Sequence, residues 1–482
     1  MTLRIYNTLS KQKEEFIPIE TGKVGMYVCG PTVYDSCHIG HARSVIVFDL
    51  IARYLRAKDY DVTYVRNFTD VDDKIINRSN ELGESPMSLA ERYIHEFHQD
   101  MDALKVERAD IEPRATHHIG QIIRLIEELV EKGVAYDIDG DVYFSVEGFD
   151  EYGKLSGRRL DDMEAGARVN IDQRKRNPFD FALWKSAKPG EPSWESPWGN
   201  GRPGWHIECS AMSMEYLGQT FDIHGGGKDL IFPHHENEIA QSEAASGKQF
   251  ARFWVHNGFI NINQEKMSKS LGNFLMIKDV LTQYHPEVIR LFVLSNHYRS
   301  PIDFTDKAVD EAGSGLDKLY SLLERVENRL GPPADEDRSP NRLSDDWRRF
   351  CEAMDDDFNS ARGIGILFDA IRNMNRLLDE HPGQLPADVA DTIQRGRTDI
   401  LKIGTIIGIL DESPGTYFKR KKDRDLEKGS IDAQTVEKLI QERVDARKAR
   451  DWARADEIRD QLTDMGVVLE DRSDGTVWKI QH

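Results

Sequence analysis

Residues 24–68 read VGMYVCGPTVYDSCHIGHARSVIVFDLIARYLRAKDYDVTYVRNF. The apolar run at 24–29, which ends at a Gly-Pro pair, is typical of a short buried strand. Apolar residues then recur at helical spacing over about 40–58. Residues 61–68 alternate in polarity and are rich in Val, Thr and Tyr, which predicts a second strand. A strand, a helix and a strand in this order indicate a parallel sheet with a right-handed crossover.

Similar signals return later in the chain. We expect strands at 220–224 and within 253–263, with a helix over 233–245 between them. The sequence therefore predicts an α/β Rossmann-like catalytic domain with a parallel, nucleotide-binding sheet. A connective region rich in Pro and Trp interrupts it, and an all-α helical domain and a small C-terminal domain follow. The predicted boundaries are 1–116 and 201–304, 117–200, 305–411 and 412–482, respectively.

The composition is that of a soluble globular protein, with 39% hydrophobic and 31% charged residues in a chain of 482. Apolar runs are far shorter than the roughly 20 residues that a membrane helix needs. No signal or transit pattern opens the chain, so a cytoplasmic location is expected. The net charge of −20 argues at first against a nucleic acid partner, but residues 412–482 carry only −1 of it and include the basic run at 419–424. Such a run is usually a solvated face, so alone it is weak support for RNA binding.

Four widely spaced cysteines are better interpreted as thiols than as a disulfide scaffold. Some could bind metal, and the alternative for any one of them is a small buried hydrophobic side chain. They lie at Cys29, Cys37, Cys209 and Cys351.

The segment His38-Ile39-Gly40-His41 follows the first strand and opens the first helix. Nucleotides bind α/β sheets at this position, against a helix N-terminus. Gly40 leaves room for adenosine near the backbone, and His38 and His41 can donate hydrogen bonds to phosphate. The alternative is a pair of surface histidines beside a turn.

A second motif, Lys266-Met267-Ser268-Lys269-Ser270, follows a later predicted strand. Its two lysines can neutralise the charge that develops on phosphorus as pyrophosphate leaves, although a solvated polar loop would have a similar composition. Together the two motifs resemble those of class I aminoacyl-tRNA synthetases. The resemblance implies attack of an amino acid carboxylate on the α-phosphate of ATP. It further implies that His38 and His41 line the ATP site, and that Lys266 and Lys269 stabilise the transition state, with Lys269 favoured as the direct ATP contact.

Cys29, Cys209, His234 and Glu238 form a chemically sensible zinc set of two thiolates, an imidazole and a carboxylate. His234 and Glu238 are four residues apart, which places both on one face of a helix. From the residues alone His235 is an equally good candidate for the imidazole, and a polar helix cap beside two buried thiols remains the alternative.

Three further segments resemble the cysteinyl-tRNA synthetase family, at 29–35, 204–209 and 232–238, and the likeness extends along the chain to MDDDFN at 354–359. The resemblance implies that Cys29, Cys209, His234 and Glu238 bind one Zn²⁺ per chain, and that Mg²⁺ accompanies ATP. It also implies that Thr69, Trp205 and Asp229 surround the bound L-cysteine, although Trp205 could instead pack in the core.

A metal is a sound device for choosing cysteine, because a plain pocket separates near-isosteres by only about 10- to 200-fold. Zinc binds a thiol as the thiolate, whereas a serine hydroxyl stays protonated and is a poor ligand. A separate editing domain would then be unnecessary, and the insert at 117–200 shows no recognisable hydrolytic site.

The same resemblance implies tRNA(Cys) as a partner, with 305–411 contacting tRNA and the small C-terminal domain recognising the anticodon; we expect a monomer. Trp452 lies among arginines at 447–456, where it could stack on a base or pack in the core. One alternative is a cysteine ligase with an amino-sugar acceptor, as in mycothiol biosynthesis, but such an enzyme should lack the C-terminal RNA-binding part. Another is a non-catalytic RNA-binding paralogue, which should have lost residues of the two ATP motifs.

Overall fold

The computed structural model describes residues 2–159, 174–262, 265–266, 275–333, 345–428, 433–465, 467–472 and 475–480. The chain divides into two compact units. The large unit comprises residues 1–319 and 333–409, and the small unit comprises residues 320–332 and 410–482.

A four-stranded sheet forms the centre of the large unit. Its order is β10-β9-β3-β4, and all three neighbouring pairs are parallel. The strands are β3 (Lys23–Val28), β4 (Asp61–Arg66), β9 (Phe221–Gly227) and β10 (Ala251–Asn257). The parallel sheet and its α/β class agree with the sequence-based prediction.

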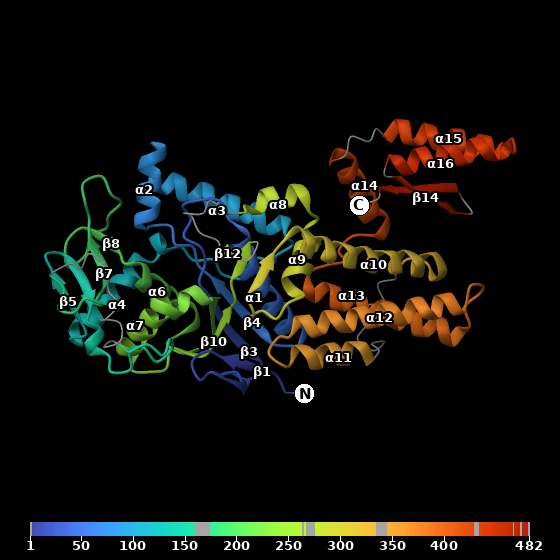
Figure 1. Ribbon diagram of the computed structural model, residues 1–482. Coiled ribbons are helices and arrows are strands. Elements are labelled where there is room, and N and C mark those ends of the chain that lie inside the picture. Colours follow the sequence, from blue (N-terminus) through green and yellow to red (C-terminus); the bar gives the residue numbers. More distant parts are fainter. Residues whose placement is uncertain are drawn as a thin grey trace. The chain divides into compact units, whose positions relative to one another are not determined.

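The predicted first helix is α1 (Ile39–Ala57), which packs against the central sheet and is shown near β4 in Figure 1. The His38 side chain caps it by accepting a hydrogen bond from the Gly40 amide. Further helices of the α/β part are α2 (Asp73–Leu82), α3 (Pro86–Ala103), α6 (Trp205–Leu217), α7 (Glu236–Ser246), α8 (Ile277–Gln283) and α9 (Pro286–Leu294). Short helical turns occur at η1 (Ala115–His117), η2 (Val146–Gly148), η3 (Lys228–Leu230) and η4 (Ile231–His235).

Two expected elements begin or end elsewhere. The helix expected over 233–245 starts as α7 only at Glu236, because Phe232 is extended (φ −140°, ψ 132°) and residues 231–235 form a separate turn. The strand expected within 253–263 is divided at Gly258, whose amide donates to the Tyr298 carbonyl. A Cβ at Gly258 would lie 2.5 Å from the Ser300 carbonyl oxygen, so only glycine fits at this break.

Smaller sheets adjoin the central one. An antiparallel sheet in the inserted region packs with α4 (Ile119–Glu131) into a core that α6 and α7 share, and Figure 1 shows these elements grouped together. Its strands are β5 (Ala135–Ile138), β6 (Asp141–Phe144), β7 (Phe181–Ser186) and β8 (Gly201–Pro203). The other strands of the large unit are β1 (Arg4–Asn7), β2 (Gln12–Glu15), β11 (Ile260–Ile262), β12 (Glu265–Lys266) and β13 (Ile302–Phe304).

After β13 the described residues of the large unit are mainly helical. The helices are α10 (Asp306–Leu330), which begins in the large unit, α11 (Asp345–Met354), α12 (Ser360–Glu380) and α13 (Ala387–Ile407). Among the described helices, none is both long and apolar enough to cross a membrane.

The small unit has a core of its own, which includes Val436, Ile458 and Trp478. Trp452 is not in this core: 59% of its surface is exposed, so the core-packing alternative for this residue is wrong. The elements of this unit after α10 are α14 (Pro414–Lys428), α15 (Ala433–Lys448), α16 (Trp452–Asp464), β14 (Val467–Arg472) and β15 (Gly475–Ile480).

Candidate active site

The carboxyl ends of β3 and β9 lie side by side. Val28 is in register with Gly225, and the Cys29 amide donates to the Gly225 carbonyl at 3.2 Å. Ligand sites of open α/β sheets form at this edge. The residues after both strands therefore meet there, although the two strands are almost 200 positions apart in the chain.

Four predicted metal ligands converge at this edge. Cys29 Sγ lies 3.7 Å from Cys209 Sγ and 3.4 Å from Glu238 Oε1. His234 Nε2 lies 3.0 Å from the same carboxylate oxygen. One donor atom from each residue falls within 4.8 Å of the others, so the structure brings together the set expected from the sequence.

A second set of possible ligands shares two of these residues. Cys29 and Glu238 also lie within 4.8 Å of His224 and His235. His224 Nε2 is 2.8 Å from Glu238 Oε2, whereas His235 Nε2 is 4.0 Å from Glu238 Oε1. The choice between His234 and His235 that the sequence left open therefore persists as a choice between two overlapping sets.

Charge is strongly redistributed within this cluster. The hydrogen bond from the Cys29 thiol lowers the pKa of Cys209 to about 6, while burial raises the pKa of Cys29 well above its ordinary value. Burial would raise the pKa of Glu238, but His224 and His234 outweigh it and hold the pKa of this carboxyl well below its usual range. At neutral pH the cluster thus offers a thiolate and a carboxylate, both suited to a divalent cation.

Two aromatic side chains contact the His234 ring. Trp205 stacks on the His234 ring with centroids 4.3 Å apart, and His206 Nδ1 lies 2.8 Å from His234 Nδ1. Trp205 is half-buried beside the cluster. Thr69 and Asp229 follow the ends of β4 and β9, Thr69 buried and Asp229 exposed.

The two histidines of the first motif are half-buried and stacked, with ring centroids 3.8 Å apart. Their stacking and partial burial favour a site over two solvated surface histidines. The Nδ1 atoms accept backbone hydrogen bonds, His38 from Gly40 at 3.1 Å and His41 from His38 at 3.3 Å. Burial lowers the pKa of His41 to about 3, so its ring is neutral. Because Nδ1 of His41 is an acceptor, the proton of this neutral ring is on Nε2.

The second motif begins in β12, where the backbone of Lys266 pairs with Asn261 of β11. The side chain of Lys266 and all of Lys269 lie outside the described residues. Described residues just after the motif adjoin the first motif: the Ile39 amide donates to Leu275 O at 2.9 Å, and the Ile277 amide donates to Cys37 O at 3.0 Å. Backbone pairing thus joins the first ATP motif to the segment that follows the second one.

Three residues of this region were missed by the sequence interpretation, namely His224, His206 and His256. His224 is buried in β9, and its ring stacks on Trp254 of β10. His256 Nε2 lies 2.8 Å from His235 Nδ1. The signal for them was the density of histidines near residues 224–256, but only the strand order shows that they meet.

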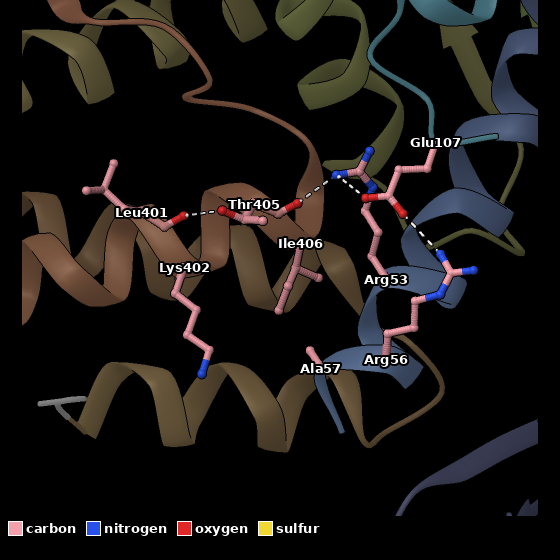
Figure 2. Close-up of a pocket in the computed structure, with 8 residues that line it drawn as sticks. All are labelled: Arg53, Arg56, Ala57, Glu107, Leu401, Lys402, Thr405 and Ile406. Atoms are coloured by element: carbon pink, nitrogen blue, oxygen red, sulfur yellow. Dashed lines mark hydrogen bonds and ion pairs between the residues drawn. The ribbon is translucent and has the colours of Figure 1, made fainter. Parts of the chain in front are cut away.

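A pocket of about 340 Å³ lies elsewhere, between the C-terminal end of α1 and α13 (Figure 2). Its guanidinium groups are already bound: Arg53 donates to Thr405 O at 3.0 Å, and Arg56 pairs with Glu107 at 3.0 Å. None of the predicted site residues lines this pocket.

Comparison with known proteins agrees with this geometry. The family model described as the tRNA synthetases class I (C) catalytic domain matches residues 15–314. The chain is 56% identical to the cysteine–tRNA ligases of Geobacter sulfurreducens, over 489 residues, and Geobacter metallireducens, over 487 residues, and both alignments cover 100% of each chain. The chain belongs to the cysteinyl-tRNA synthetase family. The predicted family, fold class and enzyme class are confirmed.

Two further family models match the C-terminal part of this member of the cysteinyl-tRNA synthetase family. A DALR domain model matches residues 349–411, and a model described as the cysteinyl-tRNA ligase anticodon binding domain matches 433–478. The fold also resembles Mycobacterium tuberculosis methionyl-tRNA synthetase in complex with methionyl-adenylate, with a TM-score of 0.62 and 18% identity over 82% of this chain and 92% of that chain. Full-length likeness to cysteine–tRNA ligases disfavours the amino-sugar ligase and the non-catalytic paralogue.

Proposed function

We propose that the chain activates L-cysteine with ATP and transfers it to the 3′-terminal adenosine of tRNA(Cys). The cysteine carboxylate attacks the α-phosphate, cysteinyl-adenylate forms, and pyrophosphate leaves. A ribose hydroxyl of the terminal adenosine then attacks the activated carbonyl carbon, and AMP leaves. One observation carries the choice of amino acid: two thiols, an imidazole and a carboxylate from separate segments converge within 4.8 Å at the edge that also bears the histidine motif.

In this proposal Zn²⁺, one per chain, is held by Cys29, Cys209, His234 and Glu238. We favour the set with two thiols over the set with His224 and His235. The first set offers zinc a second thiolate where the second set offers a second imidazole, and thiolate sulfur is the better zinc ligand. In addition, His224 and His235 are engaged as supports, His224 by the second oxygen of Glu238 and His235 by His256. When bound there, zinc would favour the thiolate of a substrate over a protonated serine hydroxyl.

Residues around the cluster suit the rest of the amino acid. Trp205 stacks on His234 and forms one wall beside the metal ligands. Asp229 is an exposed carboxylate at the end of β9, and Thr69 follows β4 on the other side of β3. We assign all three to the cysteine site, with Asp229 suited in charge to the substrate ammonium group.

For ATP, we assign His38 and His41 as hydrogen-bond donors to phosphate oxygens, His41 as a neutral ring through Nε2. Gly40 has no side chain to obstruct the adenosine. Lys266 and Lys269 neutralise the transferring phosphate, with Lys269 as the direct contact, and Mg²⁺ accompanies ATP. The pairing of residues 275–277 with residues 37–39 supports this assignment, because it holds the ends of the two motifs together.

For tRNA, we assign the helical residues 305–411 to stem contacts and residues 412–482 to the anticodon. Trp452, exposed at the start of α16, is the proposed stacking residue.

The test is cysteine-dependent ATP–pyrophosphate exchange measured against all twenty amino acids, together with charging of tRNA(Cys). We expect exchange with cysteine only, and charging that depends on ATP and cysteine. Exchange driven equally well by serine, or cysteine exchange without tRNA charging, would contradict the proposal.

A further inference from the structure

Arg43 is a buried cation close to the first ATP motif. It lies in α1, two residues after His41, and only 1% of its surface is exposed. Burial lowers the pKa of Arg43 to about 10, so the guanidinium is still charged at neutral pH. Across the part of the chain that the structure describes, no acidic side chain pairs with it. Burying a charge without a counter-ion costs free energy unless its N–H groups form hydrogen bonds.

The two terminal nitrogens of Arg43 donate to backbone carbonyls instead, whereas its Nε has no hydrogen-bond partner among the described residues. Nη2 donates to the Tyr298 carbonyl at 3.1 Å and also to the Ser300 carbonyl, and Nη1 donates to the Phe259 carbonyl. A guanidinium presents these N–H groups in one rigid plane, so a single side chain fixes three carbonyls relative to one another.

These carbonyls lie just before two paired strands. Phe259 precedes β11 and Ser300 precedes β13, and β11 pairs in parallel with β13 through Ile260 and Ile302. β11 also pairs with β12, in which Lys266 lies. Arg43 therefore connects the helix that begins at the histidine motif with the sheet that leads into the lysine motif.

Two of these carbonyls also accept backbone amides that join the segments before β11 and β13. The Gly258 amide donates to the Tyr298 carbonyl at 2.8 Å, and the Ile302 amide donates to the Phe259 carbonyl at 3.0 Å. Each carbonyl thus accepts one backbone amide and one guanidinium N–H. Loss of the guanidinium would remove one hydrogen-bond donor from both carbonyls at once.

The far side of this segment is fixed separately. Asp357 accepts hydrogen bonds from the Tyr298 hydroxyl at 2.8 Å and from Arg299 Nε at 2.8 Å. Residues 298–300 are therefore held by Asp357 through the side chains of Tyr298 and Arg299, and by Arg43 of α1 through the carbonyls of Tyr298 and Ser300.

We propose that Arg43 is a positioning residue for adenylate formation. It fixes the position of the sheet that contains Lys266 relative to the helix that begins at the histidine motif. The proposal rests on the function proposed above. Groups from both motifs must meet the same phosphate in the transition state, and a misplacement of about 1 Å can cost on the order of a hundredfold in rate.

Substitutions at Arg43 and a matched buried arginine test this role. Arg43→Lys keeps the charge without the planar fork, and Arg43→Gln removes the charge. Arg290→Lys is the control, because Arg290 is also fully buried and also donates to a backbone carbonyl, that of Ile407 at 2.9 Å, but it lies in α9 and pairs with Asp49. We expect kcat for cysteine-dependent exchange to fall at least tenfold in both Arg43 variants, with KM for cysteine and metal content within twofold of wild type. Arg290→Lys should lower Tm but keep exchange within twofold.

Hydrogen exchange gives a readout that does not depend on activity. The amides of Gly258 and Ile302 should exchange faster in both Arg43 variants than in Arg290→Lys. Two results would overturn the proposal while leaving the proposed function intact. One is a kcat for cysteine-dependent pyrophosphate exchange in Arg43→Lys within twofold of wild type, and the other is unchanged hydrogen-exchange protection of these two amides. A wild-type protein that activates a different amino acid would overturn only the proposed function, and one that activates none would overturn both.

Discussion

The metal-ligand cluster and the histidine motif both follow β3, yet they are built differently. Cys29 needs partners that α6, α7 and the turn before α7 supply, so the cluster exists only when distant segments are assembled. His38 and His41 are three residues apart and are oriented by amides of their own segment. The difference shows why loss of one ligand should disable the cluster, whereas loss of one motif histidine should remove a single contact.

The largest effect is expected for Cys209→Ser. Cys209 is buried in the cluster as the low-pKa thiol, so its loss removes a thiolate that no neighbour can replace. We expect cysteine-dependent exchange to fall by more than about a hundredfold, beyond the 10- to 100-fold typical of outer-shell partners. Metal content should fall in parallel, measured by atomic absorption. Cys351→Ala, a thiol outside the cluster, is the control; metal retained in full by Cys209→Ser would contradict the assignment.

His41→Ala should have a smaller and cleaner effect. Removing one donor to the reacting phosphate costs about 3 kcal/mol, or roughly a hundredfold in kcat for exchange. Metal content and KM for cysteine should be unchanged, because His41 is not part of the cluster. A loss of metal in this variant would show that the two regions are not independent.

His224→Ala sharpens the choice between the two ligand sets. If His224 only orients Glu238, metal affinity should fall by about 10- to 100-fold, and saturating zinc should restore exchange. His98→Ala is a matched control, since His98 also lies 2.8 Å from a carboxylate oxygen, that of Glu112, outside the site. Failure of excess zinc to restore any exchange would favour the set that includes His224.

An effect confined to tRNA binding is expected at Trp452 in the small unit. Stacking on one base is worth about 1–3 kcal/mol, so Trp452→Ala should raise KM for tRNA(Cys) by roughly 5- to 150-fold. Cysteine-dependent exchange should not change, because activation needs no tRNA contact. Trp452→Phe should retain most of the affinity, and equal loss in both variants would argue against stacking.

Much of the fold could be predicted from local sequence patterns. The run at 24–68 defines β3, α1 and β4, because each has its own periodicity and a clear end. The break of the later strand at Gly258 could not be predicted, since it depends on the approach of residues 299–300 from elsewhere in the chain.

The candidate site was predicted in part. The spacing of His234 and Glu238 suggested one helical face, and the two side chains do meet, but through an irregular turn that precedes α7. The supporting roles of His224, His256 and Arg43 depend on which strands are neighbours, and this information is absent from the local sequence around each residue. Residue type identified the donors, whereas sheet order determined their partners.

The central claim is that a metal bound at Cys29, Cys209, His234 and Glu238 selects the substrate thiol. The most direct test combines metal analysis of the purified, active protein with the ratio of kcat/KM for cysteine and serine in pyrophosphate exchange. We predict one zinc per chain and a preference for cysteine above the roughly 200-fold that a pocket without metal can reach. An active protein without stoichiometric metal, or one that activates serine within about tenfold of cysteine, would contradict the claim.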